Sequence, residues 1–182
     1  MLIDPQTALD EGWLTYLPSL EVSIDKCVQP NAIDFDCITL MELNTESPAF
    51  LSERSKVLRT HKEVPLVVTD AGSYWTLKSG CRYDFTSSFH VKLGQGVAAE
   101  LIIRSTLNRC GVFLTSGLYD SGYEGMVAGV LHVTAGDFNL APGTRIGQLK
   151  LIRSDASGRN YAGGYNHAAG TTWNGHGQHL VS

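Results

Sequence analysis

The chain has 182 residues, of which 43% are hydrophobic and 18% charged, a balance that indicates one globular domain with a sizeable core and argues against disorder. Its net charge of -4 argues against a nucleic-acid-binding protein, which needs a basic face. The first seventeen residues, MLIDPQTALDEGWLTYL, include acidic residues and no long apolar run. We therefore expect neither a signal peptide nor a membrane span, and a cytoplasmic location.

A short helix is expected over residues 5–13, because Pro5 suits a first helical turn and Gly12 suits a helix end. Short apolar runs broken by Gly, Pro, Asn and Asp follow, a pattern typical of strands and turns. The expected strands are 64–70, 73–80, 81–93, 98–105, 111–120, 125–133 and 146–152. Residues 44–63 are interpreted as a polar excursion between strands.

A second short helix is expected within residues 104–111, with Ser105 as its cap and Gly111 as its end. No long segment with helical periodicity follows the first twenty residues, so the pattern predicts an all-β domain: a barrel, sandwich or jelly roll. We expect residues 1–182 to form a single domain with a flexible, Gly-rich C-terminal arm from about residue 154. The four cysteines have no CxxC spacing and are expected to be reduced and mostly buried.

Four short stretches carry a resemblance to a known family. They are VQPNAIDFD (28–36), IRSTLNRCG (103–111), GLYDSGYEG (117–125) and PGTRIGQLKL (142–151). In this order they resemble the motifs of the dUTPase and dCTP deaminase superfamily, and the opening ALDEGWLTYLP resembles the deaminase branch. The resemblance implies a distorted jelly-roll-like β-barrel and a homotrimer with active sites between subunits. It also implies Mg²⁺-dependent chemistry on deoxypyrimidine triphosphates.

Candidate phosphate ligands lie in two of these motifs. Arg104 and Arg109 can make bidentate contacts with phosphate oxygens, and Ser105 stands where a helix start offers backbone N–H groups. The resemblance makes RSTLNR the phosphate-binding motif and gives Gln148 a phosphate contact from a strand. It places Asp34 near Mg²⁺ and its waters, whereas Asp36 has no matching role.

The hairpin motif is expected to hold the base and the sugar. Backbone groups at Gly117, Leu118 and Tyr119 can read a pyrimidine edge, and a mismatch would leave a polar group unpaired. The resemblance places the Tyr123 ring against the deoxyribose, where it leaves no room for a 2′-hydroxyl. In the C-terminal arm, Tyr165, with Tyr161 as the alternative, is the candidate for stacking on the base.

The matching aspartate for water activation is Asp120, the candidate general base of a dUTPase-type hydrolysis. Deaminases of this superfamily carry a catalytic Glu ten residues after that Asp, and here the position is Val130. Because valine cannot move a proton, the sequence favours hydrolysis of dUTP to dUMP and pyrophosphate. The alternatives are a dCTP or modified-deoxypyrimidine triphosphate pyrophosphatase, a dCTP deaminase of the same family, and a nucleotide-binding regulator without turnover.

Overall fold

The structure is a computed structural model that describes residues 1–18, 22–153, 159–163 and 166. These residues contain three short helices and fourteen strands, which confirms the mainly-β class. The helices are α1 (Pro5–Asp10), α2 (Ile24–Cys27) and α3 (Ser105–Arg109). The strands are β1 (Leu14–Tyr16), β2 (Ile33–Asp36), β3 (Thr39–Leu43), β4 (Phe50–Ser52), β5 (Ser55–Val57), β6 (His61–Glu63), β7 (Leu66–Thr69), β8 (Gly72–Leu77), β9 (Arg82–Lys92), β10 (Val97–Ile103), β11 (Val112–Thr115), β12 (Glu124–Val133), β13 (Phe138–Leu140) and β14 (Arg145–Arg153).

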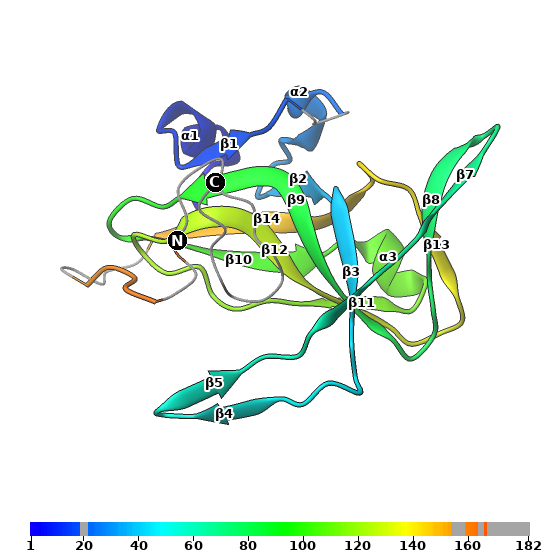
Figure 1. The fold of residues 1–182 in the computed structure, drawn as a ribbon. Helices are drawn as coiled ribbons and strands as arrows, with labels where there is room; N and C mark the ends of the chain where they lie inside the picture. The colour runs from blue at the N-terminus through cyan, green and yellow to red at the C-terminus, as the bar shows by residue number, and fades with distance from the viewer. Residues whose placement is uncertain (19–21, 154–158, 164–165, 167–182) are drawn as a thin grey trace.

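The described strands pair into four antiparallel sheets (Figure 1). The largest has six strands in the order β11-β12-β9-β3-β6, with β1 also paired to β9. Two three-stranded sheets follow the orders β10-β14-β2 and β13-β8-β7, and β4 with β5 forms a hairpin. These sheets do not close into a barrel within the described part of the chain. The expected barrel is therefore realised as open sheets, because β2 and β9 meet through side chains and not through a hydrogen-bonded ladder.

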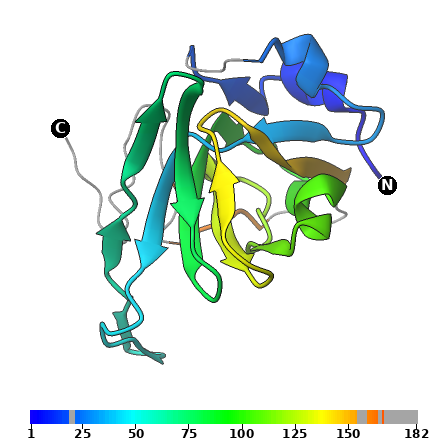
Figure 2. The same cartoon turned by 90° about the vertical axis from the view of Figure 1, so that its right-hand side faces the viewer.

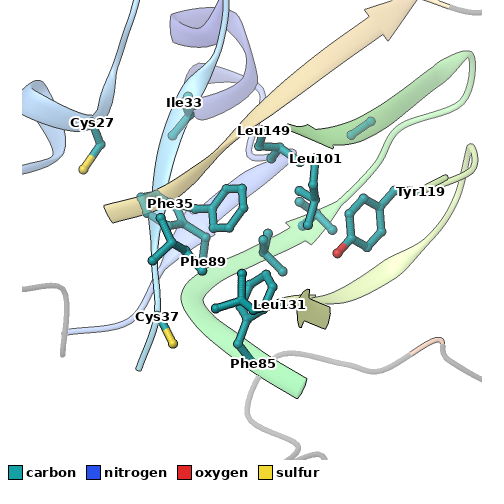
Figure 3. Packing of buried hydrophobic residues seen from close by; sticks show 14 of the residues in the cluster. Cys27, Ile33, Phe35, Cys37, Phe85, Phe89, Leu101, Tyr119, Leu131 and Leu149 are labelled. Atoms are coloured by element: carbon teal, nitrogen blue, oxygen red, sulfur yellow. The ribbon is translucent and has the colours of Figure 1, made fainter. Parts of the chain in front are cut away.

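The core lies between the six-stranded sheet and the β10-β14-β2 sheet (Figure 3). Residues of β9 alternate, so that Tyr83 and Phe85 are buried whereas Asp84 is only half-buried on the other face. Phe35 of β2 stacks on Phe85 with ring centroids 5.8 Å apart. A Cβ at Gly147 of β14 would lie 2.1 Å from the Phe35 ring, so this contact requires glycine.

A buried carboxylate connects the two sheets. Asp36, at the end of β2, is fully buried and accepts hydrogen bonds from Ser87 Oγ at 2.7 Å and from Ser88 N at 2.8 Å. Ser88 Oγ donates to the same carboxylate at 2.8 Å. Three donors of β9 therefore depend on one side chain of β2, which gives Asp36 a role in the fold that the sequence did not reveal.

The helices differ from expectation at their ends. α1 ends at Asp10, short of residue 13, because Gly12 takes a positive φ of 67° that stops the helix. The N-cap of α3 is Arg104, and Ser105 is the first helical residue, so the expected Ser105 cap is wrong. The four-residue helix α2 was not expected, and with α1 and β1 it lies along the top of the molecule in Figures 1 and 2.

The segment 44–63 is more ordered than a polar excursion. It contains β4 and β5, whose hairpin projects from the body of the molecule (Figure 1), and it ends in β6. β6 returns to the edge of the large sheet, where His61 is paired with Leu43. The segment 44–63 thereby places His61 at the edge of the six-stranded sheet.

None of the four cysteines forms a disulfide, and the expected burial holds for two of them: Cys27 and Cys37 are buried, whereas Cys81 is half-buried and Cys110 is exposed. Among the described helices, none has the length and apolar character needed to cross a membrane.

Candidate active site

A pocket of about 510 Å³ opens beside the β11–β12 hairpin. One wall is the segment 115–119 that leaves β11, and β12 and β9 supply much of the rest. Four of the residues assigned to base and sugar line it: Gly117, Leu118, Tyr119 and Tyr123. The structure therefore gathers the predicted base-binding and sugar-binding residues of the described chain around one hollow.

Its floor is one face of the six-stranded sheet. The last pair of the β11–β12 ladder is Thr115 with Val130, and Val130 is in turn paired with Asp84 of β9. Directly paired residues of antiparallel strands point to the same face, so these three side chains form a row. Thr86 and Ala128 form the next row, and all five residues line the pocket.

Tyr119 connects β10 with β12. Its backbone pairs with Ala99 through two 2.9 Å hydrogen bonds, and its ring belongs to the buried cluster (Figure 3). Its hydroxyl donates to the Ala128 carbonyl at 2.8 Å and accepts from the Ala128 N–H at 3.0 Å. The two backbone groups of Ala128 are therefore engaged by Tyr119 and are not offered to a base in this conformation.

Three tyrosines form one side of the pocket. The Tyr123 ring lies 5.0 Å from the Tyr119 ring and 5.3 Å from the Tyr161 ring, centroid to centroid. Burial raises the pKa of Tyr123, so its phenol is neutral at physiological pH. Tyr161 reaches this position because its N–H donates to the Ser121 carbonyl at 2.7 Å. The stacking candidate Tyr165 lies outside the described residues, whereas Tyr161 lines the pocket.

Asp120 lies in the turn between the two arms of the hairpin. Its side chain is exposed and does not line the pocket, and its carbonyl accepts from Tyr123 N at 3.0 Å. The turn is anchored through Ser121, whose hydroxyl accepts from Gly96 N at 2.8 Å and donates to the Gly94 carbonyl at 3.2 Å. The backbone that carries Asp120 is thus fixed, while its carboxylate stays open to water and ligand.

Residues assigned to phosphate and metal meet on the β10-β14-β2 sheet. Asp34 is buried, and its carboxylate accepts from Gln148 Nε2 at 2.9 Å and from Arg145 Nη1 at 3.1 Å. Arg104 Nε lies 3.5 Å from the same carboxylate, and Arg104 Nη1 donates to the Arg145 carbonyl at 3.2 Å. Two guanidinium groups around one carboxylate leave this cluster of Asp34, Arg104, Arg145 and Gln148 with an excess positive charge.

The cluster and the helix beside it do not share the pocket. Ser105 and Arg109 occupy the two ends of α3 and are both exposed. No residue of the cluster, and neither helix end, lines the pocket. Within the described residues of one chain, the predicted phosphate ligands and the predicted base ligands therefore belong to separate surfaces.

The carboxylate of Asp84 on the pocket floor was missed by the sequence analysis. Its Oδ2 pairs with Nε2 of His61, which comes from β6 across the intervening strand β3. Burial raises the pKa of Asp84, and the hydrogen bond and charge of His61 oppose that rise. Strand alternation in 81–93 could have placed Asp84 on the same face as Thr86, but nothing in the sequence pairs it with His61.

Comparison with known proteins agrees with this fold. A family profile described as dCTP deaminase-like matches residues 18–154, which is most of the chain. The chain therefore belongs to the dCTP deaminase-like family, within the superfamily that the motifs indicated.

Individual relatives match this chain either over part of its length or at low sequence identity. A probable deoxyuridine 5′-triphosphate nucleotidohydrolase of Archaeoglobus fulgidus is 39% identical over 77 residues, which are 41% of this chain and 45% of the relative. The crystal structure of the 2′-deoxycytidine 5′-triphosphate deaminase of Agrobacterium tumefaciens is similar, with a TM-score of 0.62 at 13% identity, over 84% of this chain and 48% of that one. The EIAV dUTPase gives a TM-score of 0.42 at 14% identity, over 68% of this chain and 95% of that one. The chain thus matches less than half of the length of the first two relatives.

Proposed function

We propose that this protein hydrolyses dUTP to dUMP and pyrophosphate with Mg²⁺. The observation that carries the proposal is the placement of Gly117, Leu118, Tyr119 and Tyr123 around one pocket beside the Asp120 turn. A similar region in a probable deoxyuridine triphosphate nucleotidohydrolase supports the choice of uracil. Val130, which lines the floor where deaminases carry their Glu, supports hydrolysis over deamination.

In the proposed complex the base enters the pocket and the deoxyribose packs on Tyr123. The neutral Tyr123 ring excludes a 2′-hydroxyl by contact, which selects deoxyribonucleotides. Asp120 takes a proton from the water that attacks the phosphate chain, and the fixed turn holds this carboxylate in position. The fixed position lowers the entropy lost when water and phosphate align.

The triphosphate requires cations that the pocket lacks, since no Lys, Arg or His is among its described lining residues. Arg104 and Arg145 supply positive charge on the other sheet, with Ser105 and Arg109 at the ends of α3. The separation of the two surfaces favours a homotrimer in which one subunit offers the pocket and another offers the phosphate ligands. We propose this assembly on the resemblance and on that separation.

Mg²⁺ fits this chain as an ion carried by the substrate. The described residues contain no group of three or more His, Cys, Asp or Glu side chains that could hold a metal. Both oxygens of buried Asp34 already accept from Gln148 or Arg145, which supports a contact with the ion through water, as proposed from the motif. When bound, Mg²⁺ neutralises charge on the phosphates, and it usually keeps several waters at such sites.

A second candidate is hydrolysis of dCTP, favoured by the Asp84 carboxylate on the pocket floor. Both candidates are tested by incubating the protein with dUTP, dCTP, dTTP or UTP, with Mg²⁺ or with EDTA, and separating the products. We expect deoxynucleoside monophosphate and pyrophosphate from dUTP, none from UTP, and loss of turnover in EDTA. Deaminated product from dCTP would contradict the argument that Val130 excludes deamination. Binding of a nucleotide without any product would refute the proposed hydrolysis and support a regulatory protein that binds nucleotides without turnover.

A further inference from the structure

The exposed apolar side chains of the molecule gather on two hairpins. Seven of the thirteen large hydrophobic residues that are exposed in the described chain lie within residues 50–68. They are Phe50, Leu51, Val57 and Leu58 at the β4–β5 hairpin and Leu66, Val67 and Val68 of β7. Single exposed residues of this kind need no explanation, whereas a concentration of them marks an interaction surface.

β7 is an edge strand without the usual protection of an edge. It ends the sheet β13-β8-β7, so one of its sides has no strand partner among the described strands. Its four residues, LVVT, are all exposed, and its pairing with β8 runs without a bulge. Edge strands that stay unpaired usually carry a Lys, a Pro or a bulge, and β7 has none of these. The strand is therefore suited to pair with a further strand.

The β4–β5 hairpin has the complementary properties. Its two strands pair only with each other among the described strands, so both outer edges are open. Phe50 is paired with Val57 and lies on one face, whereas Leu51 lies on the other face and is 79% exposed. β7 is also apolar on both faces, because its first three residues are Leu, Val and Val. Addition of one edge to the other would continue both apolar faces, which packing of a single face could not do.

Charge and shape favour the same pairing. Residues 50–59 carry three positive side chains and one negative, whereas Asp70 is the single charged residue of the β7–β8 hairpin, 66–77. Opposite charges at a rim fix the register of two partners, although one exposed pair contributes little stability. At the end of β7 lies a hollow of about 440 Å³, lined by the β7–β8 hairpin, β13 and the loop after it. The hollow has room for a projecting apolar side chain such as Leu51.

The two hairpins do not meet within one chain. They project from the body of the molecule at opposite ends (Figure 1). A contact between them therefore joins two copies, and each copy gives its β4–β5 hairpin to one neighbour and its β7 edge to another. Such heterologous contacts close into a ring when the rotation between copies allows it, and a ring of three matches the proposed homotrimer.

We infer that the β4–β5 hairpin of one subunit docks on the β7 edge of the next subunit. The partner at this surface is thus a second copy of the chain, held by strand addition and by the apolar residues of the two hairpins. The inference rests on the proposed assembly, for which it names the interface. It does not depend on hydrolysis or on the identity of the base.

Cross-linking between two introduced cysteines tests the contact directly. Leu51→Cys and Val68→Cys are made separately in a background with Cys110→Ser, because Cys110 is the exposed native thiol. A short bismaleimide should join the two variants when they are coexpressed and should join neither variant to itself, since a heterologous contact brings unlike positions together. A chain with both substitutions should give covalent trimers on a denaturing gel, and the Cys110→Ser background should give none.

Val68→Lys tests how much the β7 edge contributes to assembly. Val68 is 76% exposed, so lysine should leave the fold of one subunit intact, which far-UV circular dichroism checks, while it places a charge in the contact. We expect sedimentation to show that the midpoint concentration for trimer dissociation rises at least about tenfold, the effect of losing one important interface residue. The control Leu2→Lys changes a residue that is 47% exposed and lies outside both hairpins, and should leave the mass unchanged.

Cross-linking of either single variant to itself, or a trimer unaffected by Val68→Lys, would overturn the inference. A wild type that stays monomeric would overturn it together with the proposed assembly. A trimer that hydrolyses dUTP but does not cross-link between the two positions would overturn only this inference. Covalent trimers without hydrolysis of any triphosphate would support it and refute only the proposed activity.

Discussion

Replacing Asp120 with Asn is expected to lower kcat for dUTP hydrolysis about 10²–10⁴-fold, the usual contribution of a general base. Asn keeps the size of the side chain but cannot take a proton from water. The turn is held by the backbone of Tyr123 and by the Ser121 hydroxyl, neither of which involves the Asp120 side chain. The fold and the affinity for the nucleotide should therefore change little, so that the loss appears in kcat and not in binding.

The matched control is Glu124→Gln on the same hairpin. Glu124 lies four residues further on and forms an ion pair with Lys92 at 3.1 Å. An ion pair at the surface contributes little, so this variant should keep kcat within about twofold of wild type. If Asp120→Asn retained more than a tenth of the wild-type kcat, or if Glu124→Gln lost as much, the assignment of the base to Asp120 would be wrong.

The largest expected effect on stability comes from Asp36→Ala. The change leaves Ser87 Oγ, Ser88 N and Ser88 Oγ without their acceptor inside the protein. Loss of one partner of a buried charged network typically costs about 3–5 kcal/mol, and we expect the free energy of unfolding to fall by this amount. Urea unfolding followed by circular dichroism measures the change.

Asp36→Asn keeps one acceptor oxygen and should lose less than Asp36→Ala. The control, Asp70→Ala, removes an exposed carboxylate near the β7–β8 turn and should leave the urea midpoint unchanged. A midpoint for Asp36→Ala equal to that of the control would show that Asp36 does not connect the two sheets.

The strands that the sequence predicted are those with a marked local run of β-forming residues. The run 81–93 alternates polar and aromatic residues from Arg82 to Phe85 and became β9, and 125–133 is rich in valine and became β12. Strands β4 and β5 within 44–63 were missed because their burial is low: Phe50, for example, is 57% exposed. Neither face of the β4–β5 hairpin is buried, so its residues need not alternate between apolar and polar side chains, the pattern that marks a strand in a sequence.

Residues of the site were predictable where one short motif holds them. Gly117, Tyr119 and Tyr123 come from a single hairpin, so their common pocket follows from the motif itself. Asp84 and His61 are 23 residues apart and lie on strands separated by β3, so only the strand order brings them together. The same holds for Asp34 with Arg104 and Arg145, which the fold gathers from three strands or strand ends.

The most direct measurement is a crystal structure of the protein with Mg²⁺ and α,β-imido-dUTP. Our account predicts the base in the pocket between Tyr123 and the Asp84–Val130 row, with the deoxyribose on Tyr123. It predicts the phosphates near Arg104 and Ser105 of a neighbouring subunit. A nucleotide bound elsewhere, or one whose base lies outside the pocket, would contradict the account.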